Sequence, residues 1–358
     1  MSALSALIDA FDPDVPIEEA WTPPSAWYLD PALYAFEGDA VFARSWQPVA
    51  RLAQIPNVGD YVSGCIAGEP WVVVRSADGH AGIRAFSNVC RHKGREVVTG
   101  SGHAERLVCG YHAWTYGLDG ALRTAPKMAG IRDFDRDAMS LPELRTWVWG
   151  PWIFVAHDRD CPEPELDALE ARLDGGGWRV LRWAASRSWT VECNWKVYVD
   201  NYLDGGYHVP HMHPSLSAQL DMDTYRTELF DGYSIQSSAS DAERTTGGAL
   251  YAWLEPNFMI NRYGACMDSN HVVPLGPTRC RIDYDFFFEP SQRDDEIAAS
   301  MRQSDVTQRE DIEICESVQR GLASRHYDRG RYAPRVEQGE HHFHRLLARR
   351  YRSLPKIR

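Results

Sequence analysis

The sequence predicts an α+β protein of two domains, one built of strands alone and one that combines strands with helices. Its 358 residues correspond to about two domains, at roughly 150 residues each. Between residues 47 and 155, short runs rich in β-branched and aromatic residues alternate with Gly, Asn and Pro turns, which is typical of a small all-β domain. Beyond residue 155, strand patterns occur together with a long helical stretch at about 293–321.

The individual elements follow from local patterns along the chain. Residues 1–25 are Pro-rich and acidic, and we expect an extended lead-in there. Helical spacing of apolar residues and strand-like alternation mark the segments that follow. In chain order, the expected elements are a helix at 31–46, strands at 71–74 and 147–149, a helix at 163–173 that stops at three glycines, and a strand at 280–288.

The composition excludes several classes of protein. A net charge of −12 argues against a nucleic-acid binder, which usually carries a basic surface. No apolar stretch approaches the length of a membrane span, and residues 1–14 lack the basic start of a signal peptide. We therefore expect a cytoplasmic protein whose eight cysteines are reduced, so that cysteines at regular spacing from histidines are better interpreted as metal ligands.

Two cysteine and histidine pairs form the first functional motif. Cys90 and His92 are followed, after 16 residues, by Cys109 and His112. Four such ligands fit either one tetrahedral zinc ion or a Rieske [2Fe–2S] cluster, in which two thiolates bind one iron and two imidazoles the other. A zinc finger usually places its cysteine pair before its histidine pair, whereas here each half holds one of each within a β-rich region. The sequence therefore favours the Rieske cluster.

A second group of ligands lies about a hundred residues later. A helix running through this segment would place Asp204 and His208 on one face, with His213 in a turn beyond Pro210. Two neutral imidazoles and one carboxylate form the facial triad of non-haem Fe(II) oxygenases, which leaves positions open for O₂ and substrate. His211 is interpreted as a pocket wall. The residues alone leave the carboxylate open, because the acidic pattern around Asp311 also fits a solvent-exposed helix face.

The two motifs together resemble those of the ring-hydroxylating-type Rieske oxygenases. The runs 200–213, 255–264, 315–321 and 330–344 look more narrowly like choline monooxygenase and its relatives that act on quaternary amines, and the resemblance covers roughly residues 30–350. It implies an all-β Rieske domain beside a helix-grip catalytic domain of antiparallel sheet and helices. The expected domains are an N-terminal segment at 1–46 that packs on the catalytic domain, the Rieske domain at 47–155 and the mononuclear iron domain at 156–358.

The resemblance also implies roles for single residues. Asp311, upstream of a Gln-x-Gly motif, becomes the third iron ligand, and an acidic residue should link a cluster histidine of one subunit to an iron histidine of the next. Gly205 occupies the usual position of this acidic residue, so Asp204 is the predicted bridge, with Asp200 as the alternative; Asn201 is a further candidate catalytic residue. Such a bridge requires an oligomer, and the family is usually a homotrimer.

Electrons must come from a partner. Reduction of O₂ at iron needs two electrons, and the chain has no Gly-x-Gly-x-x-Gly fingerprint for a dinucleotide after a strand. We therefore expect a separate ferredoxin or flavin reductase that passes electrons from NAD(P)H to the cluster.

The expected reaction is O₂-dependent hydroxylation or N-demethylation of a quaternary or methylated amine such as choline or a betaine. Aromatic faces bind a quaternary ammonium group, which has no hydrogen to donate. The candidate substrate residues lie in or near the matching runs and are Tyr207, Tyr251, Trp253, Phe258, Tyr263 and Cys266. Two alternatives stay open at this point: a ring-hydroxylating oxygenase acting on an aromatic acid, and a Rieske electron-transfer protein without catalysis.

Overall fold

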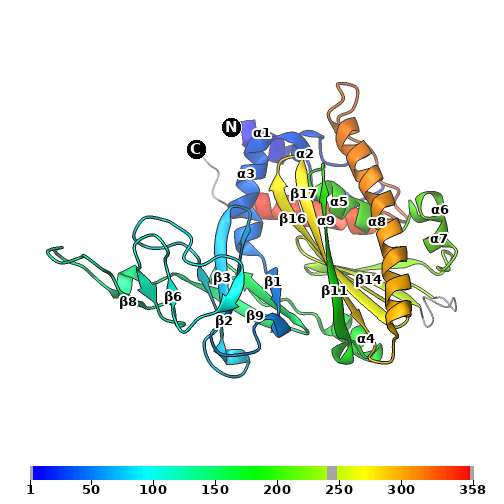
Figure 1. The fold of residues 1–358 in the computed structure, drawn as a ribbon. Helices are drawn as coiled ribbons and strands as arrows, with labels where there is room; N and C mark the ends of the chain where they lie inside the picture. Colours follow the sequence, from blue (N-terminus) through cyan, green and yellow to red (C-terminus); the bar gives the residue numbers. More distant parts are fainter. Residues whose placement is uncertain (1–2, 240–247, 355–358) are drawn as a thin grey trace. The chain divides into compact units, whose positions relative to one another are not determined.

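The structure is a computed structural model that describes residues 3–239 and 248–354 (Figure 1). The chain divides into two compact units, one formed by residues 1–41 and 164–358 and the other by residues 42–163. The second unit extends slightly beyond the predicted range 47–155 at both ends. Among the described residues, no helix combines the length and the apolar character needed to cross a membrane.

The unit of residues 42–163 is built of strands. A seven-stranded sheet has the order β1-β10-β9-β4-β3-β2-β5, and a three-stranded sheet has the order β6-β7-β8. Neighbouring strands are antiparallel, which fits short strands joined by turns. The strands are β1 (Gln47–Arg51), β2 (Asp60–Ile66), β3 (Glu69–Arg75), β4 (Ile83–Ser87), β5 (Ser101–His103), β6 (Leu107–Val108), β7 (Thr115–Tyr116), β8 (Leu122–Thr124), β9 (Glu143–Trp149) and β10 (Trp152–Ala156).

The other unit is a seven-stranded antiparallel sheet with helices. Its strand order is β11-β17-β16-β15-β14-β13-β12, so consecutive strands are neighbours from β12 to β17, while β11 pairs with β17 at the opposite edge. The strands are β11 (Arg182–Val191), β12 (Arg226–Phe230), β13 (Tyr233–Ser238), β14 (Ala249–Leu254), β15 (Phe258–Tyr263), β16 (Cys266–Gly276) and β17 (Arg279–Phe288). The helices are α1 (Ala3–Asp9), α2 (Ala26–Leu29), α3 (Pro31–Ala40), α4 (Asp167–Gly175), α5 (Trp195–Leu203), α6 (Val209–Met212), α7 (Pro214–Ser217), α8 (Asp294–Leu322) and α9 (Gln338–Ser353).

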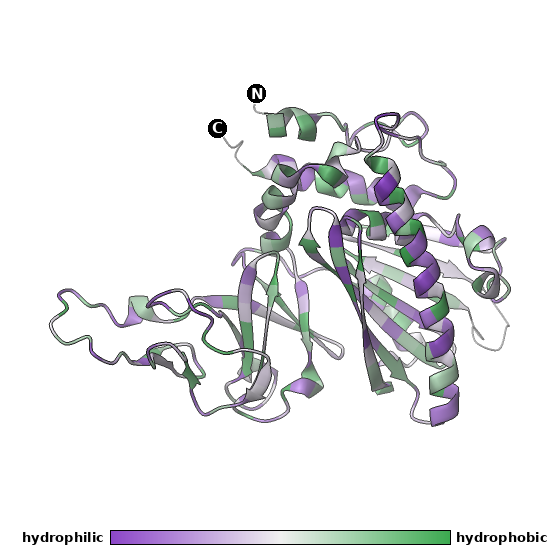
Figure 2. Ribbon diagram, turned by 45° about the horizontal axis from the view of Figure 1, so that its top comes forward, coloured by the Kyte–Doolittle hydropathy of each residue, from purple (hydrophilic) through white to green (hydrophobic). Residues whose placement is uncertain are grey.

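Helix α8 confirms the long helix predicted at 293–321, and its sequence fixes which side is buried. Met301, Gln308, Cys315 and Leu322 are buried at intervals of seven residues, so they form one stripe along the helix. In Figure 2 the colour along α8 changes repeatedly between hydrophilic purple and hydrophobic green, as expected for a helix with one buried side. Helix α5 contacts α8, α9 and strand β16, and this packing carries side chains of α5 and α8 to the same region of the sheet.

Two predicted helices have different bounds in the structure. The helix expected at 31–46 ends at Ala40, and a short 3₁₀ turn at Phe42–Arg44 leads into strand β1. The helix expected at 163–173 is Asp167–Gly175. Its later start has a local cause, since a residue that precedes proline, as Glu163 does, is disfavoured in helical conformation.

The helix predicted through residue 208 is wrong, because α5 ends at Leu203. Gly205 and Gly206 both adopt positive φ, a conformation that breaks a helix and favours glycine. A Cβ atom at Gly205 would lie 2.0 Å from the carbonyl oxygen of Val336, so the close approach of the chain at this point also requires glycine. Helix α6 then begins at Val209.

A buried ion pair joins the N-terminal segment to the catalytic unit. Lys196 on α5 lies 2.5 Å from Glu37 on α3, and both side chains are inaccessible to solvent. The Trp195 indole and the Tyr351 hydroxyl, from α9, also donate to the Glu37 carboxylate. Burial lowers the pKa of Lys196, while the charge of Glu37 opposes that shift. This network ties three helices that are far apart in the sequence.

Candidate functional site

The two predicted cluster motifs form two loops with the same hydrogen-bond pattern. The Cys90 N–H donates to the carbonyl of Arg95, and the Gly94 N–H donates back to the carbonyl of Cys90. The Cys109 loop repeats both bonds at the same spacing, with Trp114 and Ala113 as the partners. Gly94 and Ala113, at the same place in each loop, both have positive φ. The sequence therefore builds two equivalent turns, each of which presents a cysteine and a histidine.

The side chains in these loops fit a two-iron cluster better than a single ion. Both cysteines are buried in one apolar cluster, and the buried Nδ1 atom of His92 has no hydrogen-bond partner. The His92 ring stacks on Trp114 at 5.0 Å, and its centroid lies 4.6 Å from that of His112. A tetrahedral zinc site would hold its four ligand atoms within about 4 Å of one another, at Zn–S ≈ 2.3 Å and Zn–N ≈ 2.0 Å. Among the described residues, the groups with at least three potential ligand atoms within 4.8 Å of one another do not include these four side chains.

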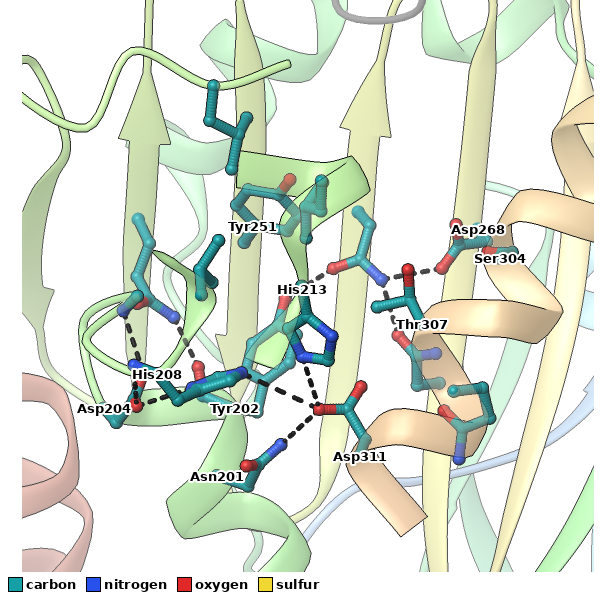
Figure 3. A pocket seen from close by; sticks show the side chains of 18 of the residues that line it. Asn201, Tyr202, Asp204, His208, His213, Tyr251, Asp268, Ser304, Thr307 and Asp311 are labelled. Atoms are coloured by element: carbon teal, nitrogen blue, oxygen red, sulfur yellow. Dashed lines mark hydrogen bonds and ion pairs between the residues drawn. The ribbon is translucent and has the colours of Figure 1, made fainter. Parts of the chain in front are cut away.

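The second predicted motif does bring three ligand atoms together. Atoms of His208, His213 and Asp311 lie within 4.8 Å of one another. Asp311 Oδ1 is 3.0 Å from His213 Nε2 and 3.7 Å from His208 Nε2 (Figure 3). The two histidines flank the short helix α6, and Asp311 projects from the same face of α8 as the pocket-lining Gln308 and Ser304. Two imidazoles and one carboxylate at these distances can share one metal ion.

Three further side chains orient this triad. Asn201 on α5 donates a hydrogen bond of 2.8 Å to Asp311 Oδ1. His208 Nδ1 lies 2.6 Å from Asp204, and His213 Nδ1 lies 2.6 Å from Glu310. Because a donating Nδ1–H leaves the lone pair of Nε2 for a metal, both contacts favour the tautomer that a ligand needs. Burial works to lower the pKa of His213, but the hydrogen bonds and charges of Asp311 and Glu310 outweigh it and raise that pKa.

A cavity next to the triad is lined mainly by aromatic and uncharged polar side chains. Its volume is about 890 Å³, including the open mouth. The lining residues besides the triad are Tyr198, Asn201, Tyr202, Asp204, Gly206, Val209, Leu216, Leu220, Tyr225, Gln236, Tyr251, Asn261, Tyr263, Asp268, Asn270, Tyr284, Ser304, Thr307 and Gln308. The strands β13 to β17 supply one wall, and α5 and α8 supply the other (Figure 3). The cavity can therefore hold a small molecule beside the metal-capable group.

Comparison with known proteins identifies the family. Residues 45–135 match the family described as Rieske [2Fe-2S] domain, and residues 178–353 match the ring hydroxylating alpha subunit (catalytic domain). Choline monooxygenase of Arabidopsis thaliana, a chloroplastic enzyme, is 45% identical over 97% of this chain and 87% of its own length. The chain belongs to the Rieske oxygenases.

Further relatives agree with this assignment. The oxygenase subunit of carnitine monooxygenase from Escherichia coli strain K12 is 33% identical over 92% of this chain and 94% of its own. The quaternary ammonium Rieske monooxygenase CntA, solved with L-carnitine, matches with a TM-score of 0.81 at 29% identity, over 95% of this chain and 97% of that one. Naphthalene 1,2-dioxygenase from Rhodococcus, at 19% identity and a TM-score of 0.77, shares the fold.

These matches confirm the predicted family, fold class and enzyme class. The chain is a Rieske non-haem iron monooxygenase with a [2Fe–2S] cluster and a mononuclear iron, and O₂ is its co-substrate. The alternative of an electron-transfer protein without catalysis is wrong, because the catalytic domain matches over nearly its whole length. The cytoplasmic location stays a prediction, since several relatives are chloroplastic.

The predicted substrate residues of this Rieske oxygenase are placed very differently from one another. Tyr251 and Tyr263 line the cavity. Trp253 lies farther along β14, where its ring packs against Phe343 of α9 at 5.4 Å and its indole donates to Pro256. The structure thus keeps two of the predicted aromatics at the cavity and places Trp253 in the core.

The other predicted residues also lie away from the cavity lining. Phe258 alternates with Asn261 along β15, so it faces the opposite side of the sheet. Cys266 is buried in an apolar cluster with Phe286 and neighbouring side chains. Tyr207 is 55% exposed. His211, expected as a pocket wall, is exposed on α6.

Asp200, the alternative bridge residue, belongs to a different network. Its carboxylate accepts a hydrogen bond of 2.7 Å from Tyr28 and lies 3.0 Å from His344 Nε2. With Glu340 and His344 it forms a second group of potential ligand atoms within 4.8 Å. Asp204, in contrast, contacts His208 directly.

Sequence reasoning missed several residues of the site. Glu310 belongs to the acidic pattern around Asp311 and was not a predicted site residue, yet it contacts His213. Tyr198, Tyr202, Tyr225 and Tyr284 line the cavity but are not among the predicted substrate residues, and Asp268 is a buried carboxylate in the same lining. Helical spacing could have indicated the part of the cavity lining that α8 supplies. Its members are spaced three and four positions apart and are Ser304, Thr307, Gln308 and Asp311.

Proposed function

We propose that this chain is an O₂-dependent monooxygenase that hydroxylates or N-demethylates a quaternary or methylated amine. The observation that carries the proposal is the cavity rich in tyrosine rings beside His208, His213 and Asp311. Ring faces attract a cation that cannot donate hydrogen bonds. Relatives that are 45% and 33% identical act, by name, on choline and carnitine.

In this proposal each metal has a defined set of ligands. Cys90, His92, Cys109 and His112 would hold the cluster, and the orphaned Nδ1 of His92 supports that role. The triad would hold the iron. When bound, these groups supply electron relay and activation of O₂. Asn201, Asp204 and Glu310 then act as positioning residues, because their contacts fix the rotamers and tautomers of the ligands.

The reaction is balanced by two external electrons. Substrate, O₂, two electrons and two protons give hydroxylated substrate and one water. Hydroxylation of an N-methyl carbon gives a hemiaminal, which breaks to formaldehyde and the demethylated amine; hydroxylation of an alcohol carbon gives an aldehyde hydrate. A separate ferredoxin or flavin reductase supplies the electrons from NAD(P)H in this proposal.

Electron transfer between subunits of a homotrimer is part of the proposal. His112 is exposed, so its outer edge is accessible to another subunit. Asp204 Oδ1 accepts from the Gly206 and Tyr207 N–H groups, and Oδ2 accepts from His208. A structure of a related quaternary ammonium Rieske monooxygenase was described in terms of inter-subunit electron transfer. Asp204 is the residue of this chain best placed to link an iron histidine to a partner's cluster.

Turnover with a substrate panel tests the proposal. The enzyme with both metals is combined with a surrogate reductase and offered choline, glycine betaine, carnitine, γ-butyrobetaine and benzoate. We expect NADH and O₂ consumption that depends on one of the amines, with aldehyde or formaldehyde as product. Turnover of benzoate alone would contradict the proposal in favour of an aromatic-acid oxygenase.

The proposed role of Asp204 in electron transfer between subunits is tested separately. Asp204→Asn should keep the iron and the cluster yet lose most turnover, while the exposed Asp223→Asn should retain it. The cluster spectrum after single-turnover reduction separates slow electron transfer from lost metal. Full turnover of Asp204→Asn with both metals present would remove the bridge assignment.

A further inference from the structure

A single buried carboxylate distinguishes the substrate cavity from a simple aromatic cage. Asp268 on β16 is 1% exposed and lines the cavity. Its carboxylate accepts hydrogen bonds of 2.7 Å from Asn261 Nδ2 and 2.6 Å from the Tyr263 hydroxyl. Figure 3 shows Asp268 among the side chains that line the cavity. The carboxylate is therefore fixed in place by the sheet.

Among the lining residues that the structure describes, none is lysine or arginine. The nearby rings respond to the negative charge: burial raises the pKa of Tyr202 well above its usual value, and the charges of Tyr225 and Asp268 raise it further. The pKa of Tyr284 is raised in the same way, by burial and then by Asp268. The cavity is thus electrostatically suited to a cation.

Two buried amide groups in the lining have donors without partners. Asn270 Nδ2 and Gln308 Nε2 make no hydrogen bond, although each side chain is 2% exposed. Buried donors are normally satisfied, so both indicate an occupant with an acceptor oxygen. Asn270 lies two residues from Asp268 on the same face of β16, and its Oδ1 already accepts from Asn261. A ligand at this part of the cavity therefore meets the Asn270 Nδ2 donor beside the Asp268 carboxylate acceptor.

We propose that Asp268 makes this enzyme selective for a singly cationic amino alcohol over a zwitterionic betaine. A hydroxyl group can accept from Asn270 and donate to Asp268, whereas a carboxylate can only accept and would lie beside a like charge. The quaternary ammonium group faces tyrosine rings in either ligand, so the discrimination comes from the second functional group. The proposal rests on the proposed function and narrows its substrate class.

Equilibrium binding tests charge selectivity independently of turnover. Calorimetry on the enzyme with both metals, without reductant, compares choline, glycine betaine and the neutral choline isostere 3,3-dimethylbutan-1-ol. We expect choline to bind roughly a hundredfold more tightly than glycine betaine, the size expected when a charged hydrogen-bond partner is exchanged for a repulsive one. Equal or tighter binding of glycine betaine by the wild-type enzyme would overturn the proposal.

Variants identify the residue responsible. Asp268→Asn keeps the shape and should weaken choline binding by roughly a hundredfold while changing binding of the neutral isostere by less than about threefold. Asp283→Asn, a carboxylate on the neighbouring strand β17 outside the cavity lining, should change neither. Unchanged choline binding in a folded Asp268→Asn protein would overturn the assignment; if that variant does not fold, the wild-type comparison still decides.

The two proposals fail in different ways. Selective binding of choline without oxidation of any amine would contradict the proposed function and leave Asp268 as the selective group. Oxidation of amines without preference between choline and glycine betaine would contradict the role of Asp268 and leave the proposed function intact.

Discussion

Replacement of Glu310 should weaken iron binding in a graded series. Glu310 Oε2 lies 2.6 Å from Nδ1 of His213, whose side chain is 1% exposed. Glu310→Gln keeps an acceptor and loses its charge. Hydrogen bonds to charged groups contribute about 1.5–3 kcal/mol and neutral ones about 0.5–1.5 kcal/mol, so the midpoints differ by about 1.25 kcal/mol, which is roughly eightfold in affinity. Glu310→Ala leaves a buried N–H without a partner and should cost about a hundredfold, the upper end of such outer-contact effects on metal sites.

The assay is competition for Fe(II) against a chelator of known affinity, with the cluster content measured by its absorbance in the same sample. Glu313→Gln is the matched control, because Glu313 is exposed on the same helix. It should bind iron like the wild type, and all three variants should keep the cluster.

The geometry predicts that iron affinity falls in the order wild type, Glu310→Gln, Glu310→Ala. Iron affinity of Glu310→Ala equal to that of the wild type would show that Glu310 does not orient His213. A loss of equal size in Glu313→Gln would instead indicate a general effect of helix charge.

Three further predictions concern stability. Lys196→Met should destabilise the fold by about 3–5 kcal/mol in denaturant titrations, because it leaves Glu37 buried without its charged partner, and the double variant with Glu37→Gln should recover much of that loss. Gly205→Ala should lower the thermal midpoint and reduce iron content together, since its Cβ would collide with Val336; normal values for both would contradict the predicted collision. Burial, followed by the charge of Arg345, lowers the pKa of His341 to about 4, so its contribution to stability is present above pH 6.5 and lost as the pH falls towards 4; His341→Gln should flatten stability over that window.

The sequence could predict the features that depend on local spacing. The cysteine and histidine pairs, the iron histidines and the long helix α8 are all local patterns, and the structure brings His208 and His213 to within 4.8 Å of Asp311. The fold class followed from the change in residue pattern near residues 47 and 155. The family resemblance indicated Asp311 as the third iron ligand, which composition alone left open.

The features that the sequence could not predict depend on tertiary contacts. Tyr251 and Trp253 share one face of β14, and only the packing of Phe343 against Trp253 decides that one ring reaches the cavity and the other does not. Glu310 has the same local pattern as the exposed Glu313, and only the position of His213 distinguishes them. Asp268 lies in an ordinary strand pattern, so its place in the cavity required the register of the sheet.

The break between α5 and α6 explains how Asp204 reaches the His208 ring. A continuous helix would place residues four apart on one face, but it would not turn four backbone and side-chain donors toward one carboxylate. The positive φ of Gly205 and Gly206 folds the chain back, so that Asp204 caps Gly206, Tyr207 and His208 and still contacts the His208 ring. Gly205 itself cannot carry a side chain there, because the chain passes against Val336. Asp204 and the two glycines therefore form one local arrangement, in which the turn replaces the helix as the means of orienting His208.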